Sequence, residues 1–191
     1  MSTAVILAGG KSRRMGRDKL NLIYNGSTLL DAAVSRFSAV FDHVYVSVGS
    51  IDRYPEIGAE RIVDEFPGCG PMAGLHAALR ATPDDGVFLA AADLPFSDPK
   101  AAMRIIELCG SCDAAMITDA EGRFEPTFGY YRKTLLPVAE ELLRAGRYKM
   151  MALFESHSIR TIDHSELGSL WHENMLDNIN FPEDYARLQG R

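Results

Sequence analysis

The chain is poor in cysteine, in long apolar runs and in positive charge, and each shortage excludes a class of protein. Three cysteines in 191 residues cannot build a disulfide framework, so we expect a reduced, cytoplasmic protein. No apolar run approaches the roughly 18 residues of a membrane span, and no basic segment leads into an apolar one at the start, so neither a membrane helix nor a signal peptide is expected. A net charge of −6 argues against nucleic acid as a partner, because nucleic-acid binding needs an extended basic face.

Two of the cysteines, Cys109 and Cys112, form a C-x-x-C pair that we interpret as incidental. A structural zinc site needs four ligands, and the sequence has no second pair. A redox pair normally opens a helix after a strand, whereas this one closes an expected helix at 98–108 and precedes a strand. The five histidines show no metal-ligand spacing either.

Positive charge is instead concentrated in one short segment behind the first apolar run. Residues 3–19 read TAVILAGGKSRRMGRDK and hold five of the chain's 20 lysines and arginines: Lys11, Arg13, Arg14, Arg17 and Lys19. Gly9 and Gly10 let backbone N–H groups approach an anion closely, and the clustered cations add to the attraction. The segment predicts a polyphosphate-binding loop, with a solvated basic turn as the plainer alternative.

Two common phosphate-binding motifs do not fit this loop. A P-loop needs a glycine five residues before its Gly-Lys pair, and that position is Val5. The dinucleotide fingerprint G-x-G-x-x-G fails because Gly9 and Gly10 are adjacent and Arg13 takes the place of its last glycine. We therefore expect the loop to bind anions through backbone N–H groups and cationic side chains, as those motifs do, but with a different spacing of its residues.

Strand and helix patterns alternate along the whole chain, which predicts one α/β domain over residues 1–191. Several strands are nearly continuous apolar runs, as expected for strands covered on both faces in a mostly parallel sheet. Ser27 and Asp98 are the expected N-caps of the helices that follow them. The expected strands are 3–8, 43–48, 60–63, 86–92, 113–118, 125–131 and 158–163. The expected helices are 28–40, 72–81, 98–108, 134–145, 149–156 and 182–188.

Three residues that directly follow expected strands predict where a site would form. They are Gly9 after the first strand, Asp64 after 60–63 and Asp93 after 86–92. Ligands of open α/β sheets lie beyond the carboxyl ends of the strands, so a basic loop and two carboxylates should share one crevice. A carboxylate beside bound phosphate needs a cation between them, and Mg²⁺, which prefers few carboxylates plus phosphate oxygens, fits with Asp93 as its ligand.

The segment LAGGKSRRMGRDK resembles the signature loop of nucleotidyltransferases with the nucleotide-diphospho-sugar transferase fold, most closely that of the molybdenum cofactor guanylyltransferases. Further segments agree with this family in order and spacing: 64–67 running into 70–74, then 92–96, 125–127 and 178–184. The resemblance implies a three-layer, Rossmann-like α/β fold in which 125–131 runs antiparallel. It also implies an Mg²⁺-dependent enzyme that joins GMP from GTP to molybdopterin and releases pyrophosphate, with proteins of the molybdenum cofactor pathway as further partners.

The resemblance also implies roles for individual residues. Lys19 and Arg14 should contact the triphosphate, and Asp93 should bind the metal. The nucleotide should lie against Leu7, Ala8, Gly9, Gly10, Asp64, Gly70 and Pro71. Asn178 and Asn180 should hold the second substrate or the outer shell of the metal. Arg123 is a further candidate for the second substrate, with a surface turn as an equal alternative.

The identity of the base rests on one residue of the signature loop. Leu7-Ala8-Gly9-Gly10 matches the guanine-using members of the family, whereas cytosine-using relatives carry Leu-Ala-Ala-Gly, so GTP is the expected donor. One departure is Gly49, which stands where the family usually has an asparagine, so its backbone or the Ser50 hydroxyl would have to substitute. The alternatives are a cytidylyltransferase or sugar-phosphate nucleotidyltransferase of the same fold, and a nucleotide-binding regulatory protein without turnover.

Overall fold

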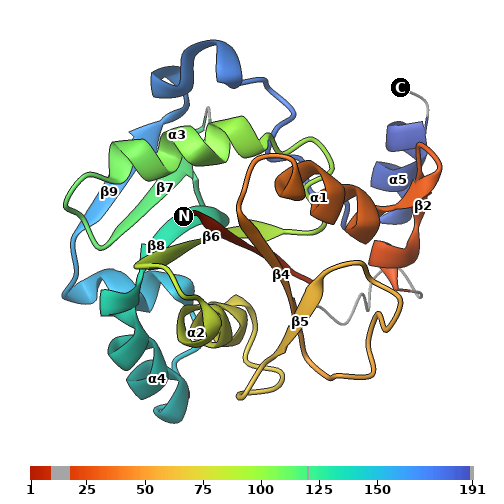
Figure 1. The fold of residues 1–191 in the computed structure, drawn as a ribbon. Coiled ribbons are helices and arrows are strands. Elements are labelled where there is room, and N and C mark those ends of the chain that lie inside the picture. Colours follow the sequence, from red (N-terminus) through yellow and green to blue (C-terminus); the bar gives the residue numbers. More distant parts are fainter. Residues whose placement is uncertain (10–17, 120, 190–191) are drawn as a thin grey trace.

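A seven-stranded sheet forms the centre of the molecule (Figure 1). A computed structural model describes residues 1–9, 18–119 and 121–189. The strands lie in the order β5-β4-β1-β6-β8-β7-β9. Their bounds are β1 Thr3–Leu7, β4 His43–Val48, β5 Glu60–Val63, β6 Gly86–Ala91, β7 Ala114–Thr118, β8 Phe124–Arg132 and β9 Ile159–Asp163. A separate hairpin pairs β2 (Ile23–Tyr24) with β3 (Ser27–Thr28).

The sheet is parallel except for β8, which runs antiparallel to both of its neighbours, β6 and β7. This confirms the mostly parallel sheet and the antiparallel direction expected for 125–131. The pairing of β8 with β6 ends at Ala90↔Phe128, so residues 124–127 project beyond the paired part of β6. Because β8 runs against its neighbours, its beginning lies at the edge where the parallel strands end.

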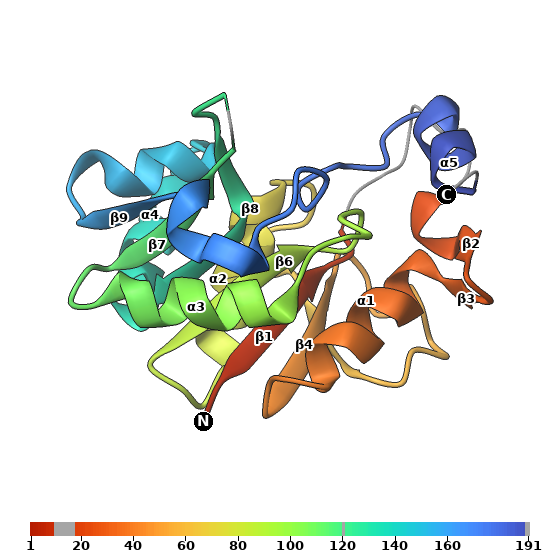
Figure 2. The same cartoon turned by 90° about the horizontal axis from the view of Figure 1, so that it is seen from above.

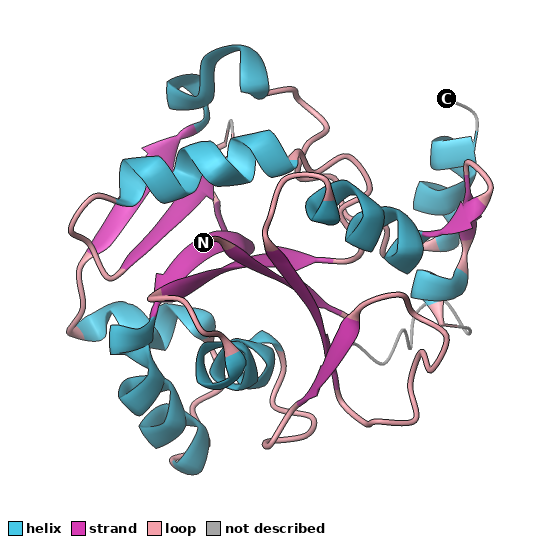
Figure 3. Ribbon diagram, viewed as in Figure 1, coloured by secondary structure: helices cyan, strands magenta, loops and turns pink. Residues whose placement is uncertain are grey.

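Helices cover both faces of the sheet and complete a three-layer α/β fold (Figure 3). On one face, α1 and α3 pack against the sheet around a core that includes Phe37, Phe88 and Phe128. On the other face, α2 and α4 pack against it around a core that includes Leu75, Leu79 and Tyr131. Alternate residues of β1 point to opposite faces, and Ile6 and Val5 accordingly belong to different cores. The α-helices are α1 Leu29–Ser38, α2 Pro71–Ala81, α3 Pro99–Cys109, α4 Leu136–Arg144 and α5 Pro182–Gln189. The 3₁₀ helices are η1 Lys19–Asn21, η2 Lys133–Leu135, η3 Met150–Glu155 and η4 His164–Leu170.

Two local predictions are corrected by the structure. The N-cap of α1 is Thr28, not Ser27, because the Thr28 hydroxyl accepts the backbone N–H of Asp31 at 3.0 Å. Ser27 pairs within the hairpin instead. The helix expected at 149–156 is 3₁₀ throughout, over Met150–Glu155. The Asp98 cap of α3 is confirmed, with its carboxylate accepting the N–H of Lys100 at 2.7 Å.

The cysteine pair lies where the sequence placed it. Cys109 ends α3, and its thiol contacts the carbonyl of Cys112 at 3.2 Å. Over the described ranges no cluster of three histidines, cysteines or carboxylates could hold a metal ion. Within the same ranges, every helix is too short or too polar to cross a bilayer.

A small third core fastens the C-terminal segment to the edge of the domain. Leu22, Leu29, Ile179 and Leu188 are buried together there. The hydroxyl of Tyr185 on α5 donates to the carbonyl of Ile23 in the hairpin at 2.7 Å, and Figure 2 shows α5 beside β2 and β3. This packing brings residues 178–180 over the carboxyl ends of the strands.

Candidate functional site

A pocket of about 380 Å³ lies at the carboxyl ends of the central strands. It gathers most of the residues predicted as site residues: Leu7, Gly9, Lys19, Asp64, Gly70, Pro71, Asp93, Asn178 and Asn180. The remaining lining residues are Leu20, Ser47, Gly68, Gly74, Ala91, Glu125 and Thr127. The basic loop's flanks and both carboxylates therefore converge on one crevice, as the order of the strands predicted.

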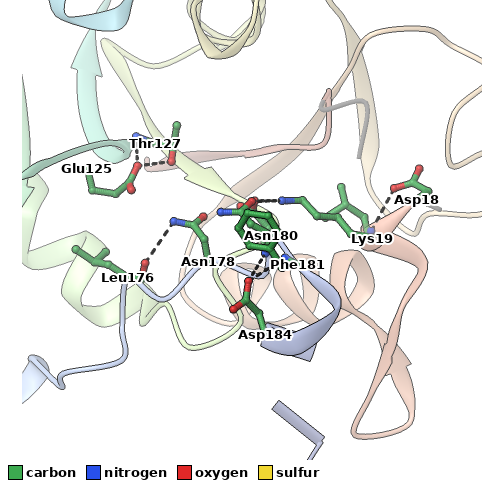
Figure 4. Close-up of polar contacts among 11 residues, drawn as sticks. Asp18, Lys19, Glu125, Thr127, Leu176, Asn178, Asn180, Phe181 and Asp184 are labelled. Atoms are coloured by element: carbon green, nitrogen blue, oxygen red, sulfur yellow. Dashed lines mark hydrogen bonds and ion pairs between the residues drawn. The ribbon is translucent and has the colours of Figure 1, made fainter. Parts of the chain in front are cut away.

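Lys19, Asp93 and Asn180 all line this pocket and are joined through Lys19. Figure 4 shows the Lys19 side chain extending toward Asn180. The Lys19 ammonium forms an ion pair with Asp93 Oδ2 and donates to Asn180 Oδ1 at 2.9 Å. The two charged side chains are only 14% and 17% exposed, so their pairing is shielded from solvent. Three elements far apart in the sequence supply this group: η1, the turn after β6, and the segment before α5.

The segment that carries Lys19 is held by its neighbour, Asp18. One oxygen of Asp18 caps η1 by accepting the N–H of Leu20 at 3.2 Å. The other accepts from the Arg53 guanidinium and the Tyr54 hydroxyl, both at 2.7 Å. Burial alone would raise the pKa of Asp18, but the hydrogen bonds from Tyr54 and Arg53 outweigh it and hold that pKa below its ordinary value. Asp18 is thus a fixed anion that places the start of η1 against the loop after β4.

The C-terminal side of the site is fixed by backbone hydrogen bonds. The N–H of Ile179 donates to the carbonyl of Asp93 at 3.0 Å, which joins the segment directly to the turn after β6. One carboxylate oxygen of Asp184 accepts the N–H groups of Asn180 and Phe181 at 3.0 and 2.9 Å. These bonds set the position from which the Asn180 side chain reaches Lys19.

Asp64 is buried beside the beginning of the signature loop. The Ser47 hydroxyl donates to its Oδ1 at 2.8 Å, and only 8% of Asp64 is exposed. Burial raises the pKa of Asp64, and the hydrogen bond from Ser47 offsets only part of that rise. A Cβ at Gly9 would lie 3.3 Å from Asp64 Oδ2, so the loop backbone passes directly against this carboxylate.

The start of α2 forms another part of the pocket wall. Gly70 precedes the helix with a φ of 72°, a conformation that favours glycine, and Pro71 occupies the first turn. Gly74 brings the helix close to the sheet, because a Cβ there would lie 2.7 Å from Ser47 Oγ and would also collide with the Leu7 side chain.

Three polar lining side chains, those of Ser47, Glu125 and Thr127, have no role predicted from the sequence. Ser47 is a small polar residue between two buried valines near the carboxyl end of β4, and that interruption is a signal that could have found it. Glu125 and Thr127 were noted only as part of a family segment. The Glu125 Oε1 atom accepts both the N–H of Thr127, at 3.0 Å, and the Thr127 hydroxyl.

Several predicted residues are not brought to the pocket. Ala8 is 1% exposed and belongs to the core rather than the lining. Arg123 is exposed in the turn before β8 and forms ion pairs with Asp119 at 2.7 Å and Glu121 at 3.0 Å. Gly49 is not a lining residue, although a Cβ there would lie 4.0 Å from the Gly9 carbonyl. Gly10 and Arg14 lie outside the described residues.

Comparison with known proteins shows the family to which the chain belongs. Residues 4–161 match the family model of the MobA-like NTP transferase domain. A probable molybdenum cofactor guanylyltransferase of Carboxydothermus hydrogenoformans is 31% identical, over 97% of this chain and 94% of the relative. A protein of the same description from Opitutus terrae is 33% identical, over 95% and 92%.

A solved structure has the same fold over nearly its whole length. Molybdopterin-guanine dinucleotide biosynthesis protein A from Archaeoglobus fulgidus superposes with a TM-score of 0.87 at 26% identity, covering 98% of this chain and 97% of the other. The chain therefore belongs to the MobA-like NTP transferase family and is a nucleotidyltransferase related to the molybdenum cofactor guanylyltransferases.

Proposed function

We propose that this nucleotidyltransferase joins GMP from GTP to the terminal phosphate of molybdopterin and releases pyrophosphate. The observation that carries the proposal is the meeting of Lys19, Asp93 and Asn180 in one pocket, with Gly9, Asp64 and Gly70 on its nucleotide side. The names of the relatives support guanine as the base and molybdopterin as the acceptor.

The donor atoms of the pocket fit Mg²⁺ as the metal. Asp93 offers one carboxylate near the centre, and the described residues include no cluster of three ligands that would enclose an ion without a nucleotide. This suits a metal that prefers one or two carboxylates and takes its other ligands from phosphate and water. When bound, Mg²⁺ would neutralise charge that develops on the phosphate oxygens.

The residues of the chain would act by positioning and charge. The Lys19 ammonium would exchange its ion pair with Asp93 for one with the triphosphate. There it would stabilise the departing pyrophosphate more than the bound substrate. Gly9, Asp64 and the start of α2 would hold the nucleoside so that the attacking and leaving oxygens are in line. No protein nucleophile is required, because the acceptor phosphate itself attacks the α-phosphorus.

The remaining assignments are carried by the family resemblance. We propose Gly10 and Arg14 for phosphate contact, and Leu7, Ala8 and Pro71 for the nucleoside. Asn178 would face the second substrate, with Asn180 linking it to Lys19. Arg123 would have to leave Asp119 and Glu121 before it could meet an anionic substrate.

Base preference tests this function. We expect kcat/KM for GTP to exceed that for CTP and ATP on the same acceptor, and GTP with Mg²⁺ to raise Tm selectively. A ligand at a hundredfold excess over Kd stabilises the folded state by about 2.7 kcal/mol. Gly9→Ala should erode the preference, because the new methyl would press on the Asp64 carboxylate.

Two outcomes would redirect the proposal. Equal or better use of CTP would favour a cytidylyltransferase. Nucleotide binding without steady-state pyrophosphate release would favour a regulatory protein.

A further inference from the structure

The beginning of β8 supplies a second wall of the pocket, across Asp93 from the nucleotide loops. Strand β6 lies between β1 and β8, and Asp93 follows β6. Gly9 after β1, Gly49 after β4 and Asp64 after β5 are therefore on one side of Asp93. Glu125 and Thr127 are on the other, in the part of β8 that projects beyond β6. A substrate that approaches Asp93 from the β8 side meets the Glu125 carboxylate.

The Glu125 side chain is fixed in place yet keeps one oxygen for a ligand. Its Oε1 atom is held by the backbone N–H and the hydroxyl of Thr127. Across the described ranges, no hydrogen-bond donor reaches Oε2. A carboxylate oxygen held in this way is a preorganised acceptor for N–H groups.

Asn178 adds a second acceptor on the same side. Figure 4 draws it between the Glu125–Thr127 pair and Asn180. Its amide nitrogen donates to the carbonyl of Leu176 at 3.4 Å, which leaves the carboxamide oxygen to accept. The β8 side of the pocket thus offers oxygens to donors, while Lys19, the ammonium among the described lining residues, contacts Asp93 and Asn180.

This distribution of charge orients an acceptor that has an anionic end and a donor end. Its phosphate must reach the α-phosphorus beside Asp93 and is repelled by Glu125, so the opposite end faces β8. A pterin ring presents an exocyclic amino group and a ring N–H side by side on one edge, which two acceptor oxygens can bind. We propose that Glu125, with Asn178 beside it, binds this amino edge and selects a pterin phosphate as the acceptor. This inference rests on the proposed function.

Glu125→Gln is the sharpest variant. The glutamine oxygen can still accept from Thr127, so the start of β8 keeps its hydrogen bonds, while an amino group replaces the oxygen that faces the pocket. The glutamine amino group would then face the amino edge of the pterin, and two hydrogen-bond donors cannot bond to each other. We expect KM for molybdopterin to rise about tenfold or more, because a charged hydrogen bond is lost and a donor is left unpaired. KM for GTP should stay within about twofold.

Matched controls separate binding from folding. Glu140→Gln makes the same chemical change on α4, outside the pocket lining, and should leave both KM values unchanged. Asn178→Leu probes the same wall from another element and should also raise KM for molybdopterin alone. It keeps the inference testable if Glu125→Gln does not fold.

Each result has a definite meaning. Wild-type protein that binds GTP but does not transfer GMP to molybdopterin would overturn the proposed function. Wild-type transfer with an unchanged KM for molybdopterin in Glu125→Gln would overturn this inference alone. An increased requirement for Mg²⁺ in that variant would instead make Glu125 a metal ligand. A competition assay adds a further check: pterin should inhibit wild type better than lumazine, in which oxygen replaces the amino group, and Glu125→Gln should lose that preference.

Discussion

Asp93, the proposed metal ligand, is already paired with a cation. The Lys19 ammonium occupies the carboxylate that Mg²⁺ is proposed to use, and Asn180 holds the same ammonium from the other side. Metal and lysine therefore compete for one group until a triphosphate arrives. Because the triphosphate attracts both cations, nucleotide and metal should bind together rather than separately.

Asp93→Asn should nearly abolish turnover while the protein stays folded. The amide keeps the shape of the side chain but removes the charge that would anchor Mg²⁺, and the loss of such a group commonly costs about a hundredfold or more in kcat. Steady-state pyrophosphate release at several Mg²⁺ concentrations measures the effect. Asp52→Asn, at an exposed position outside the pocket lining, is the matched control. A wild-type kcat in Asp93→Asn would remove Asp93 from the mechanism.

At the scale of elements, the closeness of α2 to the sheet shapes the nucleotide side of the pocket. Gly74 faces Leu7 of β1 and Ser47 of β4, and Ser47 in turn holds Asp64. A side chain at position 74 would push the helix away from both strands. The site thus depends on a missing methyl group at a helix position where alanine would ordinarily be preferred.

Gly74→Ala should destabilise the protein, against the ordinary trend for helices. Alanine in place of glycine usually stabilises a helix by about 1 kcal/mol. Here the collision with Ser47 Oγ and Leu7 should outweigh that gain, since overpacking typically costs about 1–3 kcal/mol. Urea unfolding measures the change, and KM for GTP should rise as Ser47 moves. Gly58→Ala, where nothing lies within 4 Å, should be near neutral. A Gly74→Ala variant as stable as wild type would show that the helix can shift freely.

At the scale of the whole molecule, sequence periodicity predicts the sheet and its helices but not what joins the ends of the chain. Several of the seven strands are nearly continuous apolar runs, and the sequence predicts all seven within about a residue or two of their bounds. The hairpin at 23–28 was not, because two-residue strands carry no periodicity. The carboxyl-edge rule placed Gly9, Asp64 and Asp93 correctly. It could not pair Lys19 with Asn180, which is 161 residues away, nor show that Glu125 projects past β6. Such contacts are set by tertiary packing.

The free energy of unfolding should depend on pH because Asp64 is buried. Burial raises its pKa in the folded state, so the folded protein holds this proton more tightly than the unfolded chain does. Its contribution to stability therefore falls as pH rises from the ordinary value of 3.8 through the raised pKa.

Asp64→Asn should be more stable than wild type at neutral pH and equal to it in acid, where Asp64 is protonated in both states. Thermal unfolding across this pH range tests the sign, and a variant less stable at neutral pH would contradict it. The same variant should use GTP poorly, because a pocket-lining carboxylate proposed to contact the nucleotide would lose its charge.

The contact between Lys19 and Asn180 also has a consequence for the synthesis of this chain on the ribosome. Domains emerge from the ribosome N-terminal end first. The signature loop and most strands are therefore complete while the last segment is still being made. Until Asn180 and α5 have emerged and docked on the hairpin, Lys19 lacks one of the partners that orient it. Nascent chains should thus acquire most of their tertiary fold before the Lys19 side chain is fully oriented.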